Sequence, residues 1–356
     1  MNEKTNLMKG SMMRSILITG TGEAEVRSVS KPVCADGMIL VRIEACGICT
    51  YEQRIFQGIH KTDYPVVSGH ETAGYIEAIG KDVHSEELKV GDRVIVGVTL
   101  PCRTCYPCRT GNQQSCRHFS ALKQLPGQPC IGSGGFSEYM MVLPQSVFKY
   151  YHVSPVEACL AEPLSCVIHS VETADPQFGQ TAVVIGAGFM GLLHTLLCVR
   201  RGACVIAMDF NEERLELAKK LGACYTLNPG KADAAAEIRR ITHGEGADLV
   251  FDTTPAAKTV ETAFDYIGKL GKIMIYSGIY PNQPIQINPH RIHSDSIQLL
   301  GSANSNDRDF VRAAAMISYG LVDMKPFISG IYPAEQAKEA LISSCTGKTF
   351  RNIITF

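Results

Sequence analysis

The chain of 356 residues lacks several features that would restrict its function. Its net charge is −1 and no run of Lys or Arg exceeds two residues, which argues against nucleic acid or an anionic membrane as partner. No apolar stretch has the ~20 residues of a transmembrane helix; the nearest, 183–199, is interrupted by glycines and His194. Residues 1–9 have no apolar core typical of a secretory signal. We therefore expect a cytoplasmic protein that binds neither membranes nor nucleic acids.

The composition is that of an ordinary folded protein. Hydrophobic residues make up 45% of the chain and charged residues 19%, and the length favours two domains. Without a secretory signal, the 14 cysteines are expected to stay reduced and to serve as metal ligands and buried thiols. Residues up to about 12 are expected to precede the first strand, which we place at 15–19.

The first part of the chain, up to about residue 160, has a β-type pattern. Short runs of β-forming residues separated by glycine turns occur at 39–43, 74–79 and 93–97. Many short strands with frequent turns predict a barrel-like β lobe.

Residues from about 170 to 300 alternate between strand and helix patterns. Asn211 is placed to begin one of the helices and Gly222 to end it. Such alternation predicts an α/β domain with a doubly wound parallel sheet. The expected strands are 181–185, 205–208, 248–252 and 272–276, and the first expected helix is 189–200.

The last part of the chain is mixed in character. Helices are expected at 309–319 and 334–343, and a strand at 351–356 that would complete the first lobe. We therefore expect one domain from 13–162 together with 301–356, and a second domain from 163–300.

Four cysteines lie close together in the first lobe, with the spacing C-x2-C-x2-C-x7-C. This spacing suits four thiolates around one tetrahedral structural zinc ion. An iron–sulfur loop also uses C-x2-C-x2-C, but there the next cysteine comes sooner and is followed by proline. Two disulfides are the third alternative, which the missing secretory signal disfavours. The four residues are Cys102, Cys105, Cys108 and Cys116.

A glycine-rich turn, GxGxxG, follows the strand predicted at 181–185 and begins the next helix. In this position backbone N–H groups at the helix start can bind the pyrophosphate of a dinucleotide. Asp209, 18 residues after the last glycine, can accept hydrogen bonds from the adenosine ribose, so NAD is favoured over NADP. Arg214 is close enough in sequence to bind a 2′-phosphate instead. The turn consists of Gly186, Ala187, Gly188, Phe189, Met190 and Gly191.

A second set of metal-binding residue types lies outside the four-cysteine group. Cys49, His70 and Glu162 offer a thiolate, an imidazole and a carboxylate, a combination typical of an open zinc site. Cys46 could instead pair with Cys49 as a redox couple, or be a buried core thiol.

From residue 13 to its end, the chain resembles the zinc-dependent medium-chain alcohol dehydrogenases. The motifs are Cys-Gly-Ile-Cys at 46–49, Gly-His-Glu-x-x-Gly at 69–74, the four-cysteine loop and the glycine-rich turn. Glu-Pro-Leu at 162–164 is similar to the sorbitol (L-iditol) dehydrogenase branch. The resemblance implies a mostly β GroES-like catalytic domain beside a Rossmann NAD-binding domain.

The resemblance also implies roles for individual residues. Cys49, rather than Cys46, and His70 would bind the catalytic zinc, with Glu71 as a ligand or a support for the ligands. Glu162 would be the third ligand or bind through water. Cys166 lies a helical turn beyond the matching position.

The chain departs from the family pattern near the expected proton path. The family usually carries Ser or Thr two residues after the zinc cysteine and then Asp, whereas this chain has Thr50, Tyr51 and Glu52. Tyr51 or Thr50 would therefore carry the proton. Arg54 stands where many relatives have a relay histidine and cannot act as a base. Residues 301–305 lack the substrate-contacting arginine expected in the sorbitol branch.

These features together predict an enzyme that uses zinc and NAD to oxidise a secondary alcohol of a polyol to a ketose. Its partners would be the small alcohol and further copies of itself, as a dimer or tetramer. A related dehydrogenase of L-threonine, a sugar phosphate or a simple alcohol is one alternative. A non-catalytic protein that binds zinc and nucleotide is the other.

Overall fold

The computed structural model describes residues 11–97, 101–119 and 123–356. The residues expected to precede the first strand therefore lie almost entirely outside the described part. The chain forms two compact units, one extending to Glu162 and resuming at Phe310–Phe356, the other covering Pro163–Asp309. It passes between them inside α4 (Ala161–Ala174) and again inside α10 (Asp307–Ser318).

The second unit extends nine residues further than the boundary expected at 300. Two contacts tie this additional segment to α4: Ser165 Oγ donates to Ser305 Oγ at 2.7 Å, and His169 Nδ1 lies 3.0 Å from Asp309 Oδ2. Both hydrogen bonds lie wholly within the second unit, which explains why the chain returns to the first unit at Phe310.

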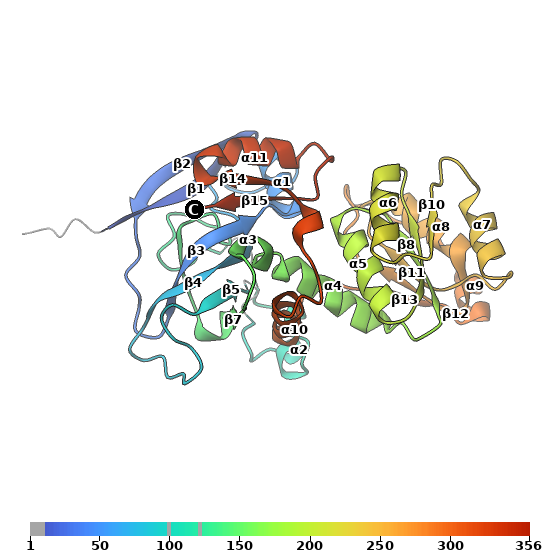
Figure 1. Cartoon of the computed structure of the whole chain (residues 1–356), viewed down its shortest axis with the longest axis horizontal. Coiled ribbons are helices and arrows are strands. Elements are labelled where there is room, and N and C mark those ends of the chain that lie inside the picture. Colours follow the sequence, from blue (N-terminus) through green and yellow to red (C-terminus); the bar gives the residue numbers. More distant parts are fainter. Residues whose placement is uncertain (1–10, 98–100, 120–122) are drawn as a thin grey trace, which may run out of the picture. The chain divides into compact units, whose positions relative to one another are not determined.

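The first unit contains a seven-stranded sheet in the order β14-β15-β3-β4-β5-β7, with β6 also paired to β3, and a separate ribbon of β1 and β2 (Figure 1). Its core lies on alternate positions such as Ile39, Val41 and Ile43, which are fully buried. The strands are β1 Met12–Gly20, β2 Glu23–Ser30, β3 Ile39–Gly47, β4 Glu71–Ile79, β5 Arg93–Val96, β6 Tyr139–Val142, β7 Val147–Lys149, β14 Ile328–Pro333 and β15 Arg351–Thr355.

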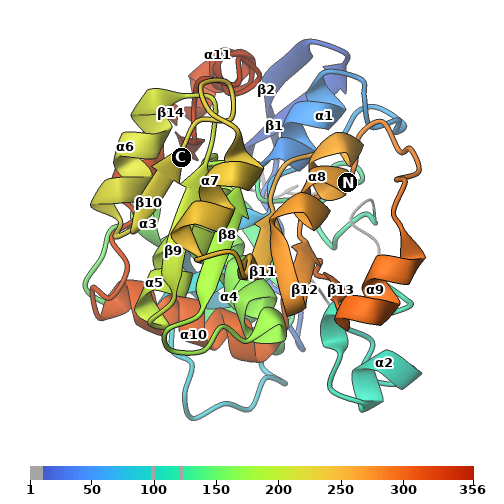
Figure 2. The ribbon, with the colours of Figure 1, turned by 90° about the vertical axis from the view of Figure 1, so that its right-hand side faces the viewer.

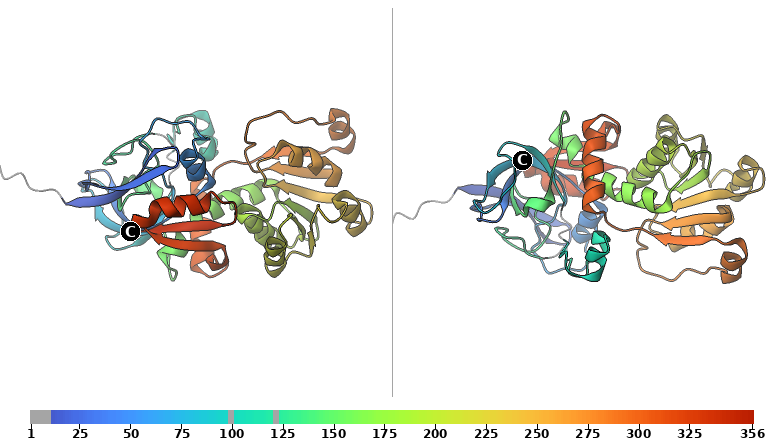
Figure 3. Two further views of the ribbon diagram at one scale, coloured as in Figure 1. Left: turned by 90° about the horizontal axis from the view of Figure 1, so that it is seen from above. Right: turned by 90° about the horizontal axis from the view of Figure 1, so that it is seen from below.

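The C-terminal strand β15 joins the sheet of the first unit, next to strands from the start of the chain. It pairs antiparallel with β3 and parallel with β14, so the red and blue segments lie side by side (Figure 3). The helices of this unit are α1 Thr50–Phe56, α2 Tyr106–Arg109, α3 Pro155–Ala158 and α11 Ala337–Ser344, with 3-10 turns at 113–115, 144–146, 325–327 and 334–336.

The second unit is a six-stranded parallel sheet in the order β10-β9-β8-β11-β12-β13, with helices alternating along the chain (Figure 2). This confirms the predicted doubly wound sheet. Val183, Ile206, Val250 and Ile273 come from four adjacent strands and share one buried face. The strands are β8 Thr181–Ile185, β9 Cys204–Met208, β10 Tyr225–Leu227, β11 Ala247–Asp252, β12 Ile267–Ile275 and β13 Gln298–Gly301.

The helices of the second unit begin largely where the sequence indicates. The side chain of Asn211 accepts from the backbone N–H of Arg214 at the start of α6, and Gly222 follows its end with φ of 102°. The helices are α5 Phe189–Arg200, α6 Glu212–Lys220, α7 Ala234–Ile241, α8 Ala257–Tyr266 and α9 Pro289–Asp295.

A buried histidine links two helices of this unit. His194 of α5 is fully buried; its Nδ1 lies 2.8 Å from the Met190 carbonyl and its Nε2 2.9 Å from Ser170 Oγ of α4. A carbonyl can only accept, so Nδ1 carries the proton and Nε2 accepts from the serine. Burial lowers the pKa of His194 to about 4, so the fold requires the neutral ring.

This histidine predicts a loss of stability in mild acid. Its folded pKa lies below the ordinary value of about 6.5, so its contribution is complete above pH ~6.5 and declines as pH falls towards 4. The free energy of unfolding should fall by about 3 kcal/mol over this range. His194→Gln should show a flatter dependence in urea unfolding at pH 7, 6, 5 and 4. Parallel curves for the two proteins would contradict the prediction.

Candidate metal centres and cofactor site

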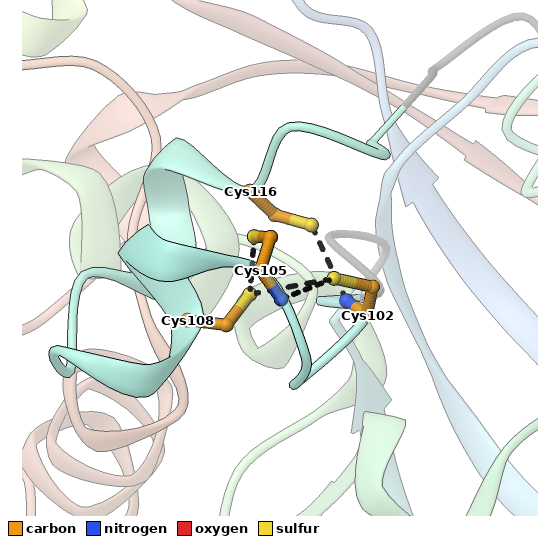
Figure 4. Close-up of side chains that lie close together, drawn as sticks. All are labelled: Cys102, Cys105, Cys108 and Cys116. Carbon is orange, nitrogen blue, oxygen red and sulfur yellow. Dashed lines mark hydrogen bonds between the residues drawn. The ribbon is translucent and has the colours of Figure 1, made fainter.

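The four predicted cysteines converge in one small loop of the first unit (Figure 4). The ligand atoms of Cys102, Cys105, Cys108 and Cys116 all lie within 4.8 Å of one another. The sulfurs of Cys105 and Cys108 are 3.5 Å apart and those of Cys102 and Cys108 are 4.0 Å apart. Four sulfurs at roughly 2.3 Å from one zinc ion would be separated by about 3.8 Å, so the donor set fits zinc.

The same geometry disfavours the other two interpretations of the cysteine loop. All four thiols are free, and their separations far exceed the ~2.05 Å of a disulfide bond. An iron–sulfur cluster distributes its cysteines over several irons, which would hold the sulfurs farther apart.

Hydrogen-bond donors surround these sulfurs. The backbone N–H of Cys102 donates to Cys116 Sγ at 3.2 Å, and that of Cys105 donates to Cys102 Sγ at 3.3 Å. Hydrogen bonds from the Thr104 hydroxyl and from the backbone N–H groups of Thr104 and Cys105 lower the pKa of Cys102 to about 5. Burial and the neighbouring sulfur of Cys105 raise the pKa of Cys108 to about 12, so full ionisation of the group requires a cation.

A second group of ligand atoms consists of Cys49, His70 and Glu71, all within 4.8 Å of one another. Strand pairing brings them together: Gly47 at the end of β3 is opposite Glu71 at the start of β4. Cys49 follows as the residue before α1. A Cβ atom on Gly47 would lie only 2.2 Å from Glu71 Oε2, so only glycine leaves room for the carboxylate.

Arg351 forms a buried ion pair with this group. Its Nη2 lies 2.7 Å from Glu71 Oε1, its Nε donates to both oxygens of Glu71 at 2.9 Å, and its Nη2 is 3.4 Å from Cys49 Sγ. The Arg351 side chain is 4% exposed and that of Glu71 0%. Burial opposes the charge, but Glu71 and Cys49 outweigh it and raise the pKa of Arg351 above its ordinary value.

Glu52, in the first turn of α1, orients the histidine. Its Oε1 is 2.9 Å from His70 Nδ1 and accepts from Ser68 Oγ at 2.8 Å, while its Oε2 accepts from the backbone N–H of Cys49 at 3.1 Å. Burial would raise the pKa of Glu52, yet the facing His70 lowers it. Because Nδ1 is engaged by Glu52, Nε2 of His70 is the nitrogen that could bind a metal.

Glu162 and Cys166 lie outside the group of metal-capable ligand atoms that contains Cys49. Glu162 is in the first turn of α4, and its charge contributes to raising the pKa of Arg351, so it lies near the group. Cys46 is a fully buried core thiol, and burial raises its pKa well above the ordinary value.

The two candidate proton carriers adjoin the metal-binding side chains. Thr50 Oγ1 is 3.8 Å from Cys49 Sγ. The ring of Tyr51 contacts His70 edge-on, with centroids 6.1 Å apart, and is tilted against His60 at 5.1 Å. The carbonyl of Arg54 accepts from the backbone N–H of His60 at 3.0 Å.

The glycine-rich turn connects β8 to α5 in the second unit. A Cβ atom on Gly191 would lie 1.8 Å from the Gly186 carbonyl oxygen, so the helix can approach the turn only with glycine there. At Gly188, just before α5, a Cβ atom would meet nothing within 4 Å. This open space at the start of a 12-residue helix fits a pyrophosphate group.

Asp209 follows β9 and lies against the same turn. Its Oδ2 accepts from the backbone N–H of Ala187 at 2.7 Å and its Oδ1 from that of Asn211 at 2.9 Å. The carboxylate is therefore fixed beside the phosphate-binding loop, where it could accept from a ribose hydroxyl. Arg214 lies in the first turns of α6, and Phe189 and Met190 begin α5.

In the described part of the chain, no helix has both the length and the apolar character needed to cross a lipid bilayer.

Comparison with known proteins relates both units to dehydrogenases. Residues 35–152 match the alcohol dehydrogenase GroES-like domain, and residues 190–318 match the zinc-binding dehydrogenase family. D-xylulose reductase A from Aspergillus oryzae is 30% identical over 326 residues, covering 89% of this chain and 88% of that protein. Sorbitol dehydrogenase from Bacillus subtilis is 28% identical, covering 92% of each chain. An alcohol dehydrogenase structure from Escherichia coli CFT073, complexed with NADH, is 25% identical with a TM-score of 0.86, covering 98% and 100%.

The four-cysteine loop should hold one of two zinc ions. Cys105→Ser should reduce the zinc content measured by mass spectrometry from two ions to one per chain and lower the stability of the loop, because one of four ligands is lost. The matched control is Cys224→Ser, an exposed thiol in the second unit, which should retain both ions. An unchanged zinc content in Cys105→Ser would rule out this site.

Glu52 should control metal affinity at the Cys49 group. Glu52→Gln keeps the size but removes the charge that faces His70, so zinc affinity there should fall about 10- to 100-fold. Competition with a chelator should show the change at one zinc ion only, with the four-cysteine ion as internal reference. The exposed Glu87→Gln serves as the control. Equal zinc affinity in wild type and Glu52→Gln would contradict the assignment.

Proposed function

We propose that this chain, which belongs to the zinc-dependent medium-chain alcohol dehydrogenases, is a polyol dehydrogenase. It would use NAD to oxidise a secondary alcohol of a polyol to a ketose. The observation that carries the proposal is the three-residue ligand group of Cys49, His70 and Glu71, which is distinct from the closed four-cysteine site. Three protein ligands leave a position open for a substrate oxygen, whereas four thiolates leave none.

The charges around the ligand group favour a divalent cation. Among the residues joined by the hydrogen bonds and the ion pair described above, with Glu162 left out of the count, Cys49 as thiolate, Glu71 and Glu52 bring three negative charges and Arg351 brings one positive charge, so with His70 neutral the balance is −2. Buried charge must be compensated, and zinc would supply +2. Thiolate, imidazole and carboxylate are also the donors that zinc prefers.

Within this site each residue would have one task. Cys49, His70 and Glu71 would hold the zinc, Glu52 would orient the His70 ring, and Arg351 would position Glu71 and Cys49. Glu162 would act through a water molecule or as a further ligand. When bound, zinc supplies a Lewis acid that makes the substrate hydroxyl more acidic, and NAD supplies the hydride acceptor.

The hydroxyl proton would leave through Thr50 or Tyr51. Thr50 lies beside the Cys49 sulfur, and Tyr51 contacts the rings of both His70 and His60. Arg54 takes no part as a base because its guanidinium stays protonated.

The cofactor would bind to the second unit through Gly186, Gly188, Phe189, Met190 and Gly191. Asp209, held by two backbone N–H groups, would accept from the adenosine ribose and disfavour the 2′-phosphate of NADP. Arg214 would bind a 2′-phosphate only if NADP were used in place of NAD.

The roles of the two units, the cellular location and the assembly are part of the same proposal. We propose that the first unit is the catalytic domain, that the second is the NAD-binding domain, and that the enzyme is a cytoplasmic homo-oligomer. None of the 14 cysteines, all of which lie in the described part of the chain, forms a disulfide bond, as is usual in a reducing compartment. Light scattering after size exclusion would distinguish a dimer or tetramer from a monomer.

The function is tested with purified zinc-loaded enzyme and NAD against a panel of alcohols, measured by NADH absorbance. Sorbitol, xylitol or iditol should be oxidised, and Cys49→Ala should lower kcat at least about 10³-fold because the Lewis acid is lost. Cys224→Ser should retain full activity. Oxidation of L-threonine, a sugar phosphate or ethanol without any polyol would overturn the substrate and leave the metal site in place.

A further inference from the structure

Two cysteines of the second unit lie next to each other, outside both candidate metal sites. Cys204 begins β9, and Cys224 is the residue before β10. The structure describes every cysteine of the chain, and Cys224 is the only one that is exposed, whereas Cys204 is half-buried. Neither belongs to the groups of metal-capable ligand atoms. A single exposed thiol indicates no function by itself; what distinguishes Cys224 is the second thiol beside it.

Strand pairing fixes the spacing of the two backbones. β9 and β10 are parallel neighbours in which Tyr225 is opposite Ile206, and the backbone N–H of Cys224 donates to the Val205 carbonyl at 2.9 Å. Cys204 therefore lies one residue along the strand from the position opposite Cys224. Neighbouring strands are about 4.8 Å apart and one residue advances a strand by about 3.3 Å, which places the two Cα atoms about 5.8 Å apart. Disulfides usually join Cα atoms that are about 4.4 to 6.8 Å apart.

The two side chains are in contact. The thiols of Cys204 and Cys224 share a hydrogen bond. Their backbones are held in place, because the N–H of Cys204 donates to the Gln180 carbonyl at 2.8 Å and that of Cys224 is bound to β9. Closing a disulfide therefore requires rotation of the two side chains and little movement of the backbone.

The two thiols differ in accessibility and in acidity. Burial and the hydrogen bond with Cys224 raise the pKa of Cys204 to about 11, so its thiol is protonated at neutral pH and reacts slowly with an oxidant in solution. Cys224 is open to solvent, so a small oxidant reaches its sulfur first. Cys224 is thus suited to be oxidised, and Cys204 to close the bond with it.

We propose that Cys204 and Cys224 form a reversible redox pair that closes to a disulfide when the protein meets a peroxide. Hydrogen peroxide oxidises the Cys224 thiol to a sulfenic acid and is reduced to one water molecule. The Cys204 sulfur then attacks the Cys224 sulfur, and the departing hydroxide takes the Cys204 proton and leaves as a second water molecule. A dithiol reductant restores both thiols and is itself oxidised to a disulfide.

The disulfide would fasten an edge strand to its neighbour. β10 has three residues and lies at the edge of the six-stranded sheet, next to β9 (Figure 2). The bond would close the loop 204–224, which contains α6, and restrict the unfolded chain. The pair lies at the amino ends of the two strands, whereas dinucleotides bind at the carboxyl ends, so NAD binding should be unchanged. The proposal therefore does not depend on the proposed function.

Calorimetry measures this fastening. After one equivalent of hydrogen peroxide, the unfolding temperature of the second unit should rise by about 5 to 10 °C, and a dithiol should reverse the rise. Cys224→Ser should show no rise. A wild type that is cross-linked and yet unfolds at an unchanged temperature would contradict the fastening of β10.

Mass spectrometry of the zinc-loaded protein tests the bond itself. Protein treated with one equivalent of peroxide, alkylated and digested without reduction should yield a peptide pair that joins Cys204 to Cys224 and disappears after reduction. Cys34→Ser, which removes a half-buried thiol of the first unit, is the matched control and should retain the pair. Oxidation of Cys224 to a sulfinic acid in wild type, without a cross-link, would overturn the proposal.

A second variant identifies the order of the two steps. Cys204→Ser leaves the Cys224 sulfenic acid without its partner thiol, so labelling of Cys224 with dimedone should rise at least about fivefold over wild type. Cys224→Ser should show no such increase at Cys204, because that thiol is protonated and less accessible. Equal labelling of Cys224 in wild type and Cys204→Ser would refute the role of Cys204.

Discussion

The pairing of β3 with β4 on one side and with β15 on the other is the constraint on which the candidate catalytic site depends. This pairing sets Gly47 opposite both Glu71 and Ile353, so that the ends of three strands meet beside Cys49. A shift of register by one residue would turn the side chain of Glu71 to the other face of the sheet. The backbone determines which residues come close together. The buried ion pair with Arg351 then orients the side chain of Glu71, and the hydrogen bond with Glu52 orients that of His70.

The local features of the fold were predictable from the sequence. β8 and α5 have the predicted limits, because a continuous apolar strand and a glycine-rich turn are both encoded by neighbouring residues. The four cysteines also gather as expected, since all four lie within one short loop. β14 was not predicted because its glycine and proline weaken the strand pattern. The second unit ends at residue 309 rather than 300 because residues up to 309 form hydrogen bonds with α4.

The residues that join the candidate site from distant parts of the chain could not be predicted from the sequence in the same way. Arg351 is 302 residues from Cys49, and only the pairing of β15 with β3 shows that it reaches the metal-binding side chains. Glu52 was visible as a departure from the family pattern, but a glutamate three residues after a cysteine is usually solvated. Its complete burial and its contacts with His70 and Ser68 give it a role that residue type alone did not indicate. The place of Glu162 relative to the zinc ligands stays a prediction.

The position of Arg351 near the end of the chain has a consequence for biosynthesis. The four-cysteine loop is complete once residue 116 has been made, so it can capture zinc while the ribosome is still translating the second unit. The Cys49 group, in contrast, lacks its buried cation until β15 has been synthesised and has joined the sheet. The surroundings of the two candidate metal sites are therefore completed at different times during synthesis, and a protein truncated before β15 would have the complete four-cysteine loop but a Cys49 group without Arg351.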